Sequence, residues 1–273
     1  MQPALPHQAI VVFDIDGVIR DVGGSYRRAL ADTVEHFTHQ AYRPTPTDID
    51  TLKAEGLWNN DWQASQELIY RYFEAHGQSR TEINLDYEAL VTFFQNRYRG
   101  PDPQNWTGYI CQEPLLVNAL YLQSLTQANI TWGFFSGATR ASATYVLETR
   151  LGLQSPTLIA MEDAPGKPDP TGLIATVNQL EQQQTIGEQT PGDVNETTPV
   201  LYIGDTVADM QTVLNVRDLV PNRNWIGVGV LPPHAQQTQV YSSSYTEKLQ
   251  QAGASIVLKN VEELTAEKIR GLV

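Results

Sequence analysis

The hydrophobic positions of this chain follow two patterns, short unbroken runs and longer helix-like repeats. An unbroken apolar run of about four to eight residues that ends at a turn residue is typical of a strand buried on both faces of a sheet. The sequence predicts strands at residues 9–13, 130–135, 158–161, 200–203, 225–230 and 255–258. Helical repeats separate most of these strands, and this alternation predicts an α/β fold with a parallel sheet covered by helices on both faces.

The predicted helices between these strands follow from apolar residues at helical spacing. We expect them at residues 114–127, 140–152, 169–184 and 208–218. Pro114 suits the first turn of the first of these helices, and Gly152 suits the C-cap of the second. The polar, glutamine-rich stretch 181–199 predicts a mobile surface loop, for which the sequence suggests no function.

One long stretch, residues 25–105, contains no run typical of a buried strand. Its apolar residues recur at helical spacing instead, in segments 25–40, 46–55, 61–77 and 86–100. Glycine- and proline-rich sequences flank the stretch on both sides, as is typical of hinges. The sequence therefore predicts a helical domain, residues 23–105, inserted into an α/β domain made of residues 1–22 and 106–273.

The charge of the chain limits its partners. With 273 residues and a formal net charge of -13, we expect binding neither to nucleic acid nor to an anionic membrane surface. The single cysteine, Cys111, excludes an internal disulfide bond and suits a reducing compartment. The first residues resemble no signal peptide and no membrane segment is evident, so we expect a cytoplasmic protein. Its oligomeric state cannot be predicted from the sequence.

Polar residues follow four of the predicted strands where each one ends. They are Asp14 and Asp16, then Ser136, then Lys167, and finally Asp205 and Asp209. Ligands of an open parallel sheet bind beyond the carboxyl ends of its strands, so we expect these side chains to converge. Four carboxylates in one crevice repel one another unless a cation lies among them, and oxygen ligands together with a phosphate favour Mg²⁺.

The same residues suggest a phosphoryl-transfer reaction. Asp14 could attack phosphorus and form an aspartyl-phosphate, while Asp16 could protonate the leaving oxygen and later deprotonate water. Backbone amides near Gly17 could bind phosphate oxygens, because glycine permits close approach. Ser136 could donate a hydrogen bond to the phosphate, and Lys167 could offset its charge and steady the nucleophile.

Together, the segments "DIDGVIRD", "FFSGATR", "GKPDP" and "GDTVAD" resemble the four motifs of the haloacid dehalogenase-like superfamily, in order and spacing, over nearly the whole chain. The resemblance implies a Rossmann-like core, phosphoryl transfer through Asp14 and a helical cap of the subfamily I type that closes over the substrate. It implies that Mg²⁺ is bound by the Asp14 carboxylate, the Asp16 backbone carbonyl and Asp205, with Asp209 nearby. The second motif departs from the usual Thr-Asn or Ser-Asn, and we expect Ser136 to act there together with the Gly137 amide.

The predicted helical domain offers candidates for substrate recognition. The segment 56–65 brings two tryptophans and two asparagines into a predicted loop, and loops of this kind often determine specificity. The candidates are Trp58, Asn59, Asn60 and Trp62, although the tryptophans could equally belong to the core of the helical domain. Arg20 could bind a substrate anion or form a surface salt bridge.

The sequence therefore favours a phosphatase acting on a small phosphorylated metabolite, such as a sugar phosphate or a phosphoglycolate-like compound. A dehalogenase is disfavoured, because the resemblance implies that such enzymes lack the second aspartate, which is present here as Asp16. A phosphonatase would need a lysine nucleophile in the helical domain, where only Lys53 is available. A sugar phosphomutase and a binding protein without turnover remain alternatives.

Overall fold

The computed structural model describes residues 9–58, 60–187 and 198–273 of the chain. The chain forms two compact units. One, here called the α/β unit, contains the residues up to Arg20 and from Leu115 to Val273, and the other, the helical unit, contains Asp21–Pro114. Asn59 and part of the glutamine-rich stretch, residues 188–197, lie outside the described residues.

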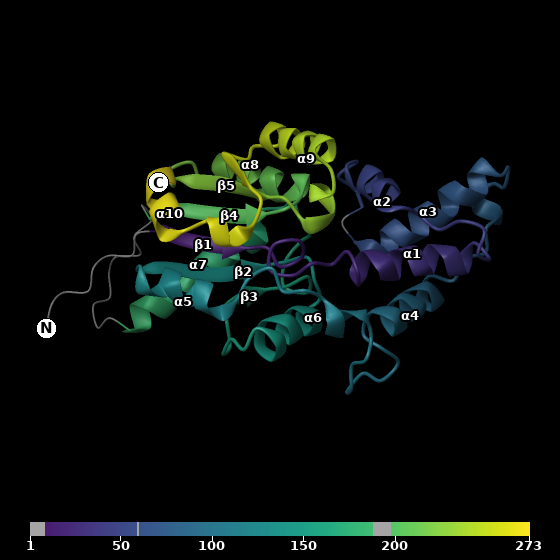
Figure 1. The fold of residues 1–273 in the computed structure, drawn as a ribbon, viewed down its shortest axis with the longest axis horizontal. Coiled ribbons are helices and arrows are strands. Elements are labelled where there is room, and N and C mark those ends of the chain that lie inside the picture. Colours follow the sequence, from purple (N-terminus) through teal and green to yellow (C-terminus); the bar gives the residue numbers. More distant parts are fainter. Residues whose placement is uncertain (1–8, 59, 188–197) are drawn as a thin grey trace, which may run out of the picture. The chain divides into compact units, whose positions relative to one another are not determined.

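The α/β unit is built on a six-stranded sheet in which all neighbouring strands are parallel. Its strands are β1 (Ala9–Phe13), β2 (Ile130–Phe135), β3 (Leu158–Ile159), β4 (Val200–Gly204), β5 (Trp225–Val230) and β6 (Ile256–Leu258). They lie in the order β3-β2-β1-β4-β5-β6, so the first strand is central (Figure 1). The predicted Rossmann-like α/β fold is confirmed, and the predicted strands lie within two residues of those observed.

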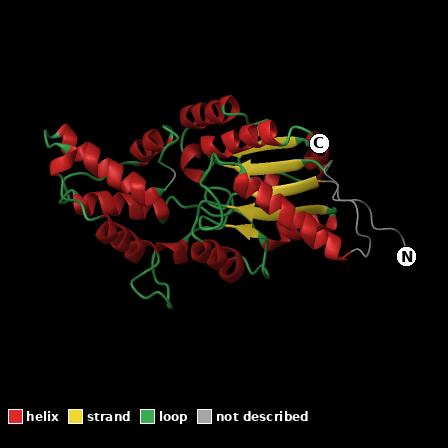
Figure 2. Ribbon diagram, turned by 180° about the vertical axis from the view of Figure 1, so that it is seen from behind, coloured by secondary structure: helices red, strands yellow, loops and turns green. Residues whose placement is uncertain are grey.

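Helices cover both faces of this sheet (Figure 2). They are α5 (Ala119–Gln127), α6 (Arg140–Thr144), α7 (Thr171–Gly187), α8 (Val207–Leu219), α9 (Gln239–Gln251) and α10 (Ala266–Leu272). The π-helix η3 (Tyr145–Arg150) continues α6, and η4 (Pro233–Gln236) and η5 (Val261–Glu263) are short 3-10 helices. Leu173 of α7 and Val213 of α8 belong to one apolar cluster with Ile10 and Val12 of β1. On the other face, the Phe13 ring packs against Tyr121 of α5. Burial on both faces explains why these strands read as unbroken apolar runs.

Two helix boundaries differ from the sequence prediction. Helix α5 begins only at Ala119, because the Asn118 side chain caps it, and Pro114 is therefore not in its first turn. Helix α7 continues through Gly187, so the predicted loop over 181–199 is wrong for residues 181–187. Gly152, expected to end the helical segment after β2, has the predicted left-handed conformation, with φ of 78°.

In its described residues, the helical unit contains four α-helices and two short 3-10 helices. They are α1 (Tyr26–Phe37), α2 (Pro46–Lys53), α3 (Asp61–Ala75) and α4 (Tyr87–Tyr98), with η1 (Arg80–Glu82) and η2 (Tyr109–Gln112). Helix α1 packs against both α3 and α4, and the Tyr26 ring contacts Phe94 and Tyr98 of α4. Helices in this stretch are as the sequence predicts.

The second boundary of the helical unit lies at Pro114, whereas the sequence analysis places it at residues 105 and 106. The reason is the packing of η2 on the helices. The Tyr109 hydroxyl donates a hydrogen bond to Asp32 over 2.7 Å, and the Arg28 guanidinium lies 4.2 Å from the centre of the Tyr109 ring.

In the part of the chain that the structure describes, we find no helix with the length and apolar composition that a membrane span requires.

Candidate active site

The carboxyl edge of the sheet brings the sequence motifs together. Phe13 pairs in register with Phe134 of β2 and with Ile203 of β4, so the residues that follow these strands share one edge. The Asp14 amide donates a hydrogen bond to the Ile203 carbonyl over 2.8 Å, which fixes the Asp14 backbone beside β4. Asp205 follows β4 directly at this edge.

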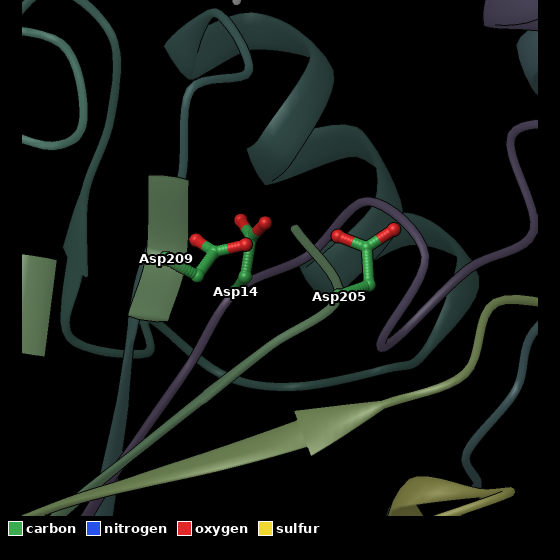
Figure 3. Close-up of side chains that lie close together, drawn as sticks. All are labelled: Asp14, Asp205 and Asp209. Carbon is green, nitrogen blue, oxygen red and sulfur yellow. The ribbon is translucent and has the colours of Figure 1, made fainter. Parts of the chain in front are cut away.

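Three buried carboxylates form the centre of this edge. One oxygen from each of Asp14, Asp205 and Asp209 lies within 4.8 Å of the others. Figure 3 shows the Asp14 and Asp209 carboxylates next to each other, with that of Asp205 facing them. Asp209 belongs to the first turn of α8, whereas the other two follow β1 and β4. Among the described residues this is the group of acidic, histidine or cysteine side chains close enough to share a metal ion.

Lys167 lies between two of these carboxylates. Its ammonium nitrogen is 2.9 Å from Asp14 Oδ1 and 2.7 Å from Asp209 Oδ1, and the lysine side chain is almost fully buried. The loop between β3 and α7 carries Lys167. The lysine also lies over the Phe135 and Tyr202 rings, 5.2 and 5.4 Å from their centres. It supplies the positive charge that a buried acidic cluster requires.

The two oxygens of Asp209 are held by several further donors. The Tyr202 hydroxyl donates to Oδ1 over 2.9 Å, and the Thr206 backbone amide and hydroxyl donate to Oδ2 over 3.0 and 2.6 Å. The Asp209 amide donates back to the Thr206 hydroxyl, which completes a capping box at the start of α8. Asp209 therefore both caps a helix and holds Lys167.

The electrostatics of the cluster are governed by burial. Loss of water, opposed by Lys167 and reinforced by the other carboxylates, raises the pKa of Asp14 to about 7. Burial and the charges of Asp209 and Asp14 raise the pKa of Asp205 well above its usual value. Although burial acts against it, the ion pair with Lys167 and the bonds from Thr206 lower the pKa of Asp209. Burial also opposes the charge on Lys167, but Asp14 and Asp209 raise the pKa of this lysine.

Close packing at this edge requires glycine at two positions. A Cβ atom on Gly17 would lie 2.0 Å from Asp205 Oδ2, and Gly17 has a φ of 75° that disfavours other residues. A Cβ atom on Gly204 would lie 2.3 Å from the Asp209 side chain. The two glycines therefore allow the Asp205 and Asp209 carboxylates to approach the loop after β1 and the end of β4.

Asp16 lies outside the group of three carboxylates and has a different partner. Its Oδ1 accepts a hydrogen bond from Arg20 Nε over 2.6 Å, and Arg20 Nη2 lies 2.5 Å from the same oxygen. The Arg20 guanidinium is therefore buried and paired with the partly exposed Asp16, and does not form the surface salt bridge that the sequence analysis weighed against binding of a substrate anion.

Ser136 follows β2 and is buried. Its amide donates to the Ile159 carbonyl over 3.0 Å, and its hydroxyl accepts a hydrogen bond from the Ala138 amide over 3.2 Å. The next residue, Gly137, is exposed, and a Cβ atom there would have no neighbour within 4 Å among the described residues. The exposed backbone of Gly137 therefore lies next to the buried side chain of Ser136.

The candidate recognition residues of the helical unit have local roles. The Trp58 indole donates to Glu55 over 2.9 Å, and the Asn60 side chain caps α3 by accepting from the Trp62 amide over 2.9 Å. The Trp62 indole nitrogen is buried and has no hydrogen-bond partner among the described residues. Lys53, the lysine considered for phosphonatase chemistry, pairs with Asp61 over 2.7 Å.

Two side chains of the site escaped the sequence analysis. Thr206 stands three residues before Asp209, and the pattern Thr-x-x-Asp at a helix start was the available signal for its capping role. Tyr202 lies inside β4 and reads as a core residue, so no pattern in the sequence indicates its hydroxyl bond to Asp209.

The residues present suit a hard divalent cation such as Mg²⁺. All donors of the cluster are oxygens. A positive ion would offset the effects of burial and of mutual repulsion, which raise the pKa values of Asp14 and Asp205. Asp14 and Asp205 are the better candidates for direct ligands, because both oxygens of Asp209 already accept hydrogen bonds.

The fold is therefore of the α/β class, with a buried acidic cluster and a lysine at the carboxyl edge of its parallel sheet. The family model described as haloacid dehalogenase-like hydrolase matches residues 9–216, and the chain belongs to this family. The match includes the site residues of the α/β unit and the helical unit, and it ends within α8.

Comparison with known proteins gives one relative in sequence and several solved structures of similar fold. An imidazoleglycerol-phosphate dehydratase of Phytophthora nicotianae is 29% identical over 93% of this chain, and the chain spans about half (51%) of that protein. A phosphatase from Thermococcus thioreducens has a similar structure, with a TM-score of 0.61 and 23% identity, over 81% of this chain and 92% of that one. A Thermotoga maritima protein provisionally named beta-phosphoglucomutase has a TM-score of 0.57 and 16% identity, over 97% of this chain and all (100%) of that one.

Proposed function

We propose that this protein is a Mg²⁺-dependent phosphatase that hydrolyses a small organic phosphomonoester through an aspartyl-phosphate on Asp14. The observation that carries the proposal is the buried contact of Lys167 with both Asp14 and Asp209, next to Asp205. Burying three carboxylates and an ammonium group costs free energy, and such arrangements are concentrated at functional sites.

In this proposal Asp14 and Asp205 hold the Mg²⁺ ion, with the Asp16 backbone carbonyl as the further ligand that the family resemblance implies. When bound, the ion would offset the negative charge of the carboxylates and of the substrate phosphate. Asp209 has a supporting role, since it forms an ion pair with Lys167 and caps α8.

The reaction then proceeds in two steps. A carboxylate oxygen of Asp14 attacks phosphorus, the bond to the ester oxygen breaks, and Asp16 donates a proton to the departing alcohol. In the second step water attacks phosphorus and gives a proton to Asp16, and the bond from Asp14 to phosphorus breaks. Lys167 and the Ser136 hydroxyl, together with amides near Gly17 and Gly137, are suited to bind phosphate oxygens in both steps.

The helical unit is proposed to act as a cap that recognises the rest of the substrate. The Trp62 indole is the best candidate in its segment, because its buried N–H group has no partner among the described residues. Asn60 is a weaker candidate, since its side-chain oxygen caps α3.

The proposed substrate is a small phosphorylated metabolite, such as a sugar phosphate or a phosphoglycolate-like compound. The name of the Phytophthora protein adds an imidazole-bearing phosphomonoester to the compounds worth testing. The present chain matches only about half of the Phytophthora protein. Imidazoleglycerol phosphate is therefore included as a test compound only.

A sugar phosphomutase is the second candidate, favoured by the name of the Thermotoga protein of similar fold. The two activities use the same aspartates and differ in the fate of the phosphoryl group. A phosphatase hydrolyses the aspartyl-phosphate readily, whereas a mutase retains the group until a sugar accepts it.

The test is phosphate release from sugar phosphates, phosphoglycolate and imidazoleglycerol phosphate, with Mg²⁺ and with EDTA, for wild type and Asp14→Asn. We expect Mg²⁺-dependent release that falls by at least about a thousandfold in the variant. Labelling at Asp14 by a bis-phosphorylated sugar without release would favour the mutase. Neither release nor labelling would favour a binding protein without turnover.

A further inference from the structure

Arg20 of the α/β unit has a fully buried side chain, with 0% exposure. A buried guanidinium requires charged or hydrogen-bonding partners, since removal from water costs far more than a salt bridge at the surface gains. One of its partners is Asp16, two residues from the nucleophile proposed above. The position of this charge therefore concerns the reaction and not only the fold.

Two nitrogen atoms of Arg20 approach the same oxygen of Asp16: Nε donates a hydrogen bond, and Nη2 forms an ion-pair contact. Nε lies 2.6 Å and Nη2 lies 2.5 Å from Oδ1. Within the described part of the chain, Oδ2 of Asp16 accepts no hydrogen bond, and 28% of the Asp16 side chain is exposed. Arg20 thus anchors the carboxyl group through one oxygen and leaves the other available.

The backbone fixes Arg20 at the right place for this contact. The Gly17 amide donates to the Arg20 carbonyl over 2.9 Å, and the Arg20 amide donates to the Ile15 carbonyl over 3.2 Å. Arg20 also forms a β-bridge with Leu115, where the chain returns to the α/β unit. The loop from Asp14 to Arg20 is closed on itself, so the guanidinium reaches Asp16 without a mobile segment.

We propose that Arg20 is a positioning residue for Asp16. It holds Oδ1 so that Oδ2 gives its proton to the ester oxygen as that oxygen leaves phosphorus, and takes a proton from water in the second step. The inference rests on the phosphatase proposed above and adds a residue that sets the efficiency of its proton transfers. Arg20 touches neither the phosphate nor the departing alcohol in this role.

The test compares two aromatic esters of similar size, p-nitrophenyl phosphate and benzyl phosphate. p-Nitrophenolate is a stable anion and leaves without a proton, whereas the benzyl alkoxide needs one. The release of each alcohol in a single turnover measures the first step alone. For Arg20→Met we expect a loss of at least about tenfold with benzyl phosphate and less than about threefold with p-nitrophenyl phosphate. Arg20→Lys keeps the charge and should recover part of the benzyl rate.

Asp16→Asn and the double variant Asp16→Asn/Arg20→Met complete the experiment. If Arg20 acts through Asp16, the second substitution should not lower the benzyl rate of Asp16→Asn further. The double variant also removes both members of the ion pair, so it tests the proposal even if Arg20→Met alone does not fold. Thermal unfolding of each variant identifies those that fold.

Equal losses with the two esters in Arg20→Met, or a further loss in the double variant, would overturn the proposal while leaving the phosphatase intact. A wild type that releases neither alcohol would instead overturn the phosphatase, and with it this role of Arg20. The two failures are therefore distinguished by the activity of the wild-type protein.

Discussion

The α/β unit and the helical unit both contain clusters of ion-paired side chains, yet the two clusters differ in their contact with water. In the α/β unit, Lys167, Asp14 and Asp209 are almost fully buried. In the helical unit, Arg71 pairs with Glu55 where the two side chains are 42% and 36% exposed. Exposed pairs of this kind contribute only about 0–1 kcal/mol to stability.

The pKa values differ between the clusters for the same reason. Burial is the largest influence on Asp14 and raises its pKa to about 7. Hydrogen bonds from Arg71 are the largest influence on Glu55 and lower its pKa to about 2. The Arg71–Glu55 pair satisfies its charges at the surface, whereas the acidic cluster of the α/β unit keeps charges in a state that is unfavourable without a further cation. This contrast supports the proposal that the carboxyl edge of the sheet is the active site.

Removal of the buried lysine should have the largest effect. In Lys167→Met, Asp14 and Asp209 lose their buried counter-charge, which typically costs about 3–5 kcal/mol. We expect the melting temperature in EDTA to fall by about 10 °C and turnover to fall by at least about a hundredfold.

The exposed Lys259 provides the matched control for this variant. Lys259→Met removes the same charge from the surface and should change stability by no more than about 0.5 kcal/mol. Similar melting temperatures for the two variants would contradict the distinction between buried and exposed charges.

Gly17→Ala should have the next largest effect. The new methyl group would lie 2.0 Å from Asp205 Oδ2, and the residue would be forced into a φ of 75°. We expect turnover to fall by about a hundredfold, because a small displacement of a site carboxylate has that consequence.

Gly56→Ala separates the two causes, since Gly56 has a φ of 76° but no neighbour within 4 Å of the added carbon among the described residues. It should cost only about 1 kcal/mol in unfolding measurements and leave turnover unchanged. If Gly17→Ala behaves like Gly56→Ala, contact with Asp205 is not what requires glycine at that position.

The sequence predicts some features of this site and not others. The strands were predictable because burial on both faces leaves unbroken apolar runs, and the order of the motifs then predicted that Asp14, Lys167 and Asp209 would meet. The sequence could not predict that contact with Asp205 requires glycine at position 17, because this contact joins residues far apart in the chain. The bond from Tyr202 to Asp209 was hidden for a similar reason, since a tyrosine inside a buried strand looks like any other core residue.

The third prediction concerns pH and metal together. Asp14 has a pKa of about 7 in the folded protein and its ordinary value of 3.8 when unfolded, so the folded state binds more protons between these values. Stability without metal should therefore decrease as the pH rises from about 4 to 7. The lowered pKa of Asp209 affects stability only below about pH 3.8, its ordinary pKa, and therefore outside this pH window.

A bound cation would offset the ionised Asp14, so Mg²⁺ should raise the melting temperature more at pH 8 than at pH 5.5. The expected difference is at least about 3 °C, and it should shrink in Asp14→Asn. An equal effect of Mg²⁺ at both pH values would argue against an Asp14 that changes its ionisation in this range.

The smallest effect is expected in the helical unit, for Glu55→Gln. Glu55 accepts bonds from Arg71 over 2.6 and 2.7 Å, but both side chains are exposed, so water and salt screen the pair. A carboxyl with a lowered pKa stabilises the protein above its ordinary pKa, here 4.5, and this contribution is lost as the pH falls towards 2. At pH 7 we expect a loss of at most about 1 kcal/mol, which should largely disappear in about 1 M salt.

Glu67→Gln is the informative comparison, because Glu67 is buried and accepts from both Arg71 and Arg80. It should cost more than Glu55→Gln and depend less on salt, since burial shields that pair from ions. If the two variants respond equally to salt, exposure is not what separates weak from strong ion pairs in this protein, and the contrast between its two units would need another cause.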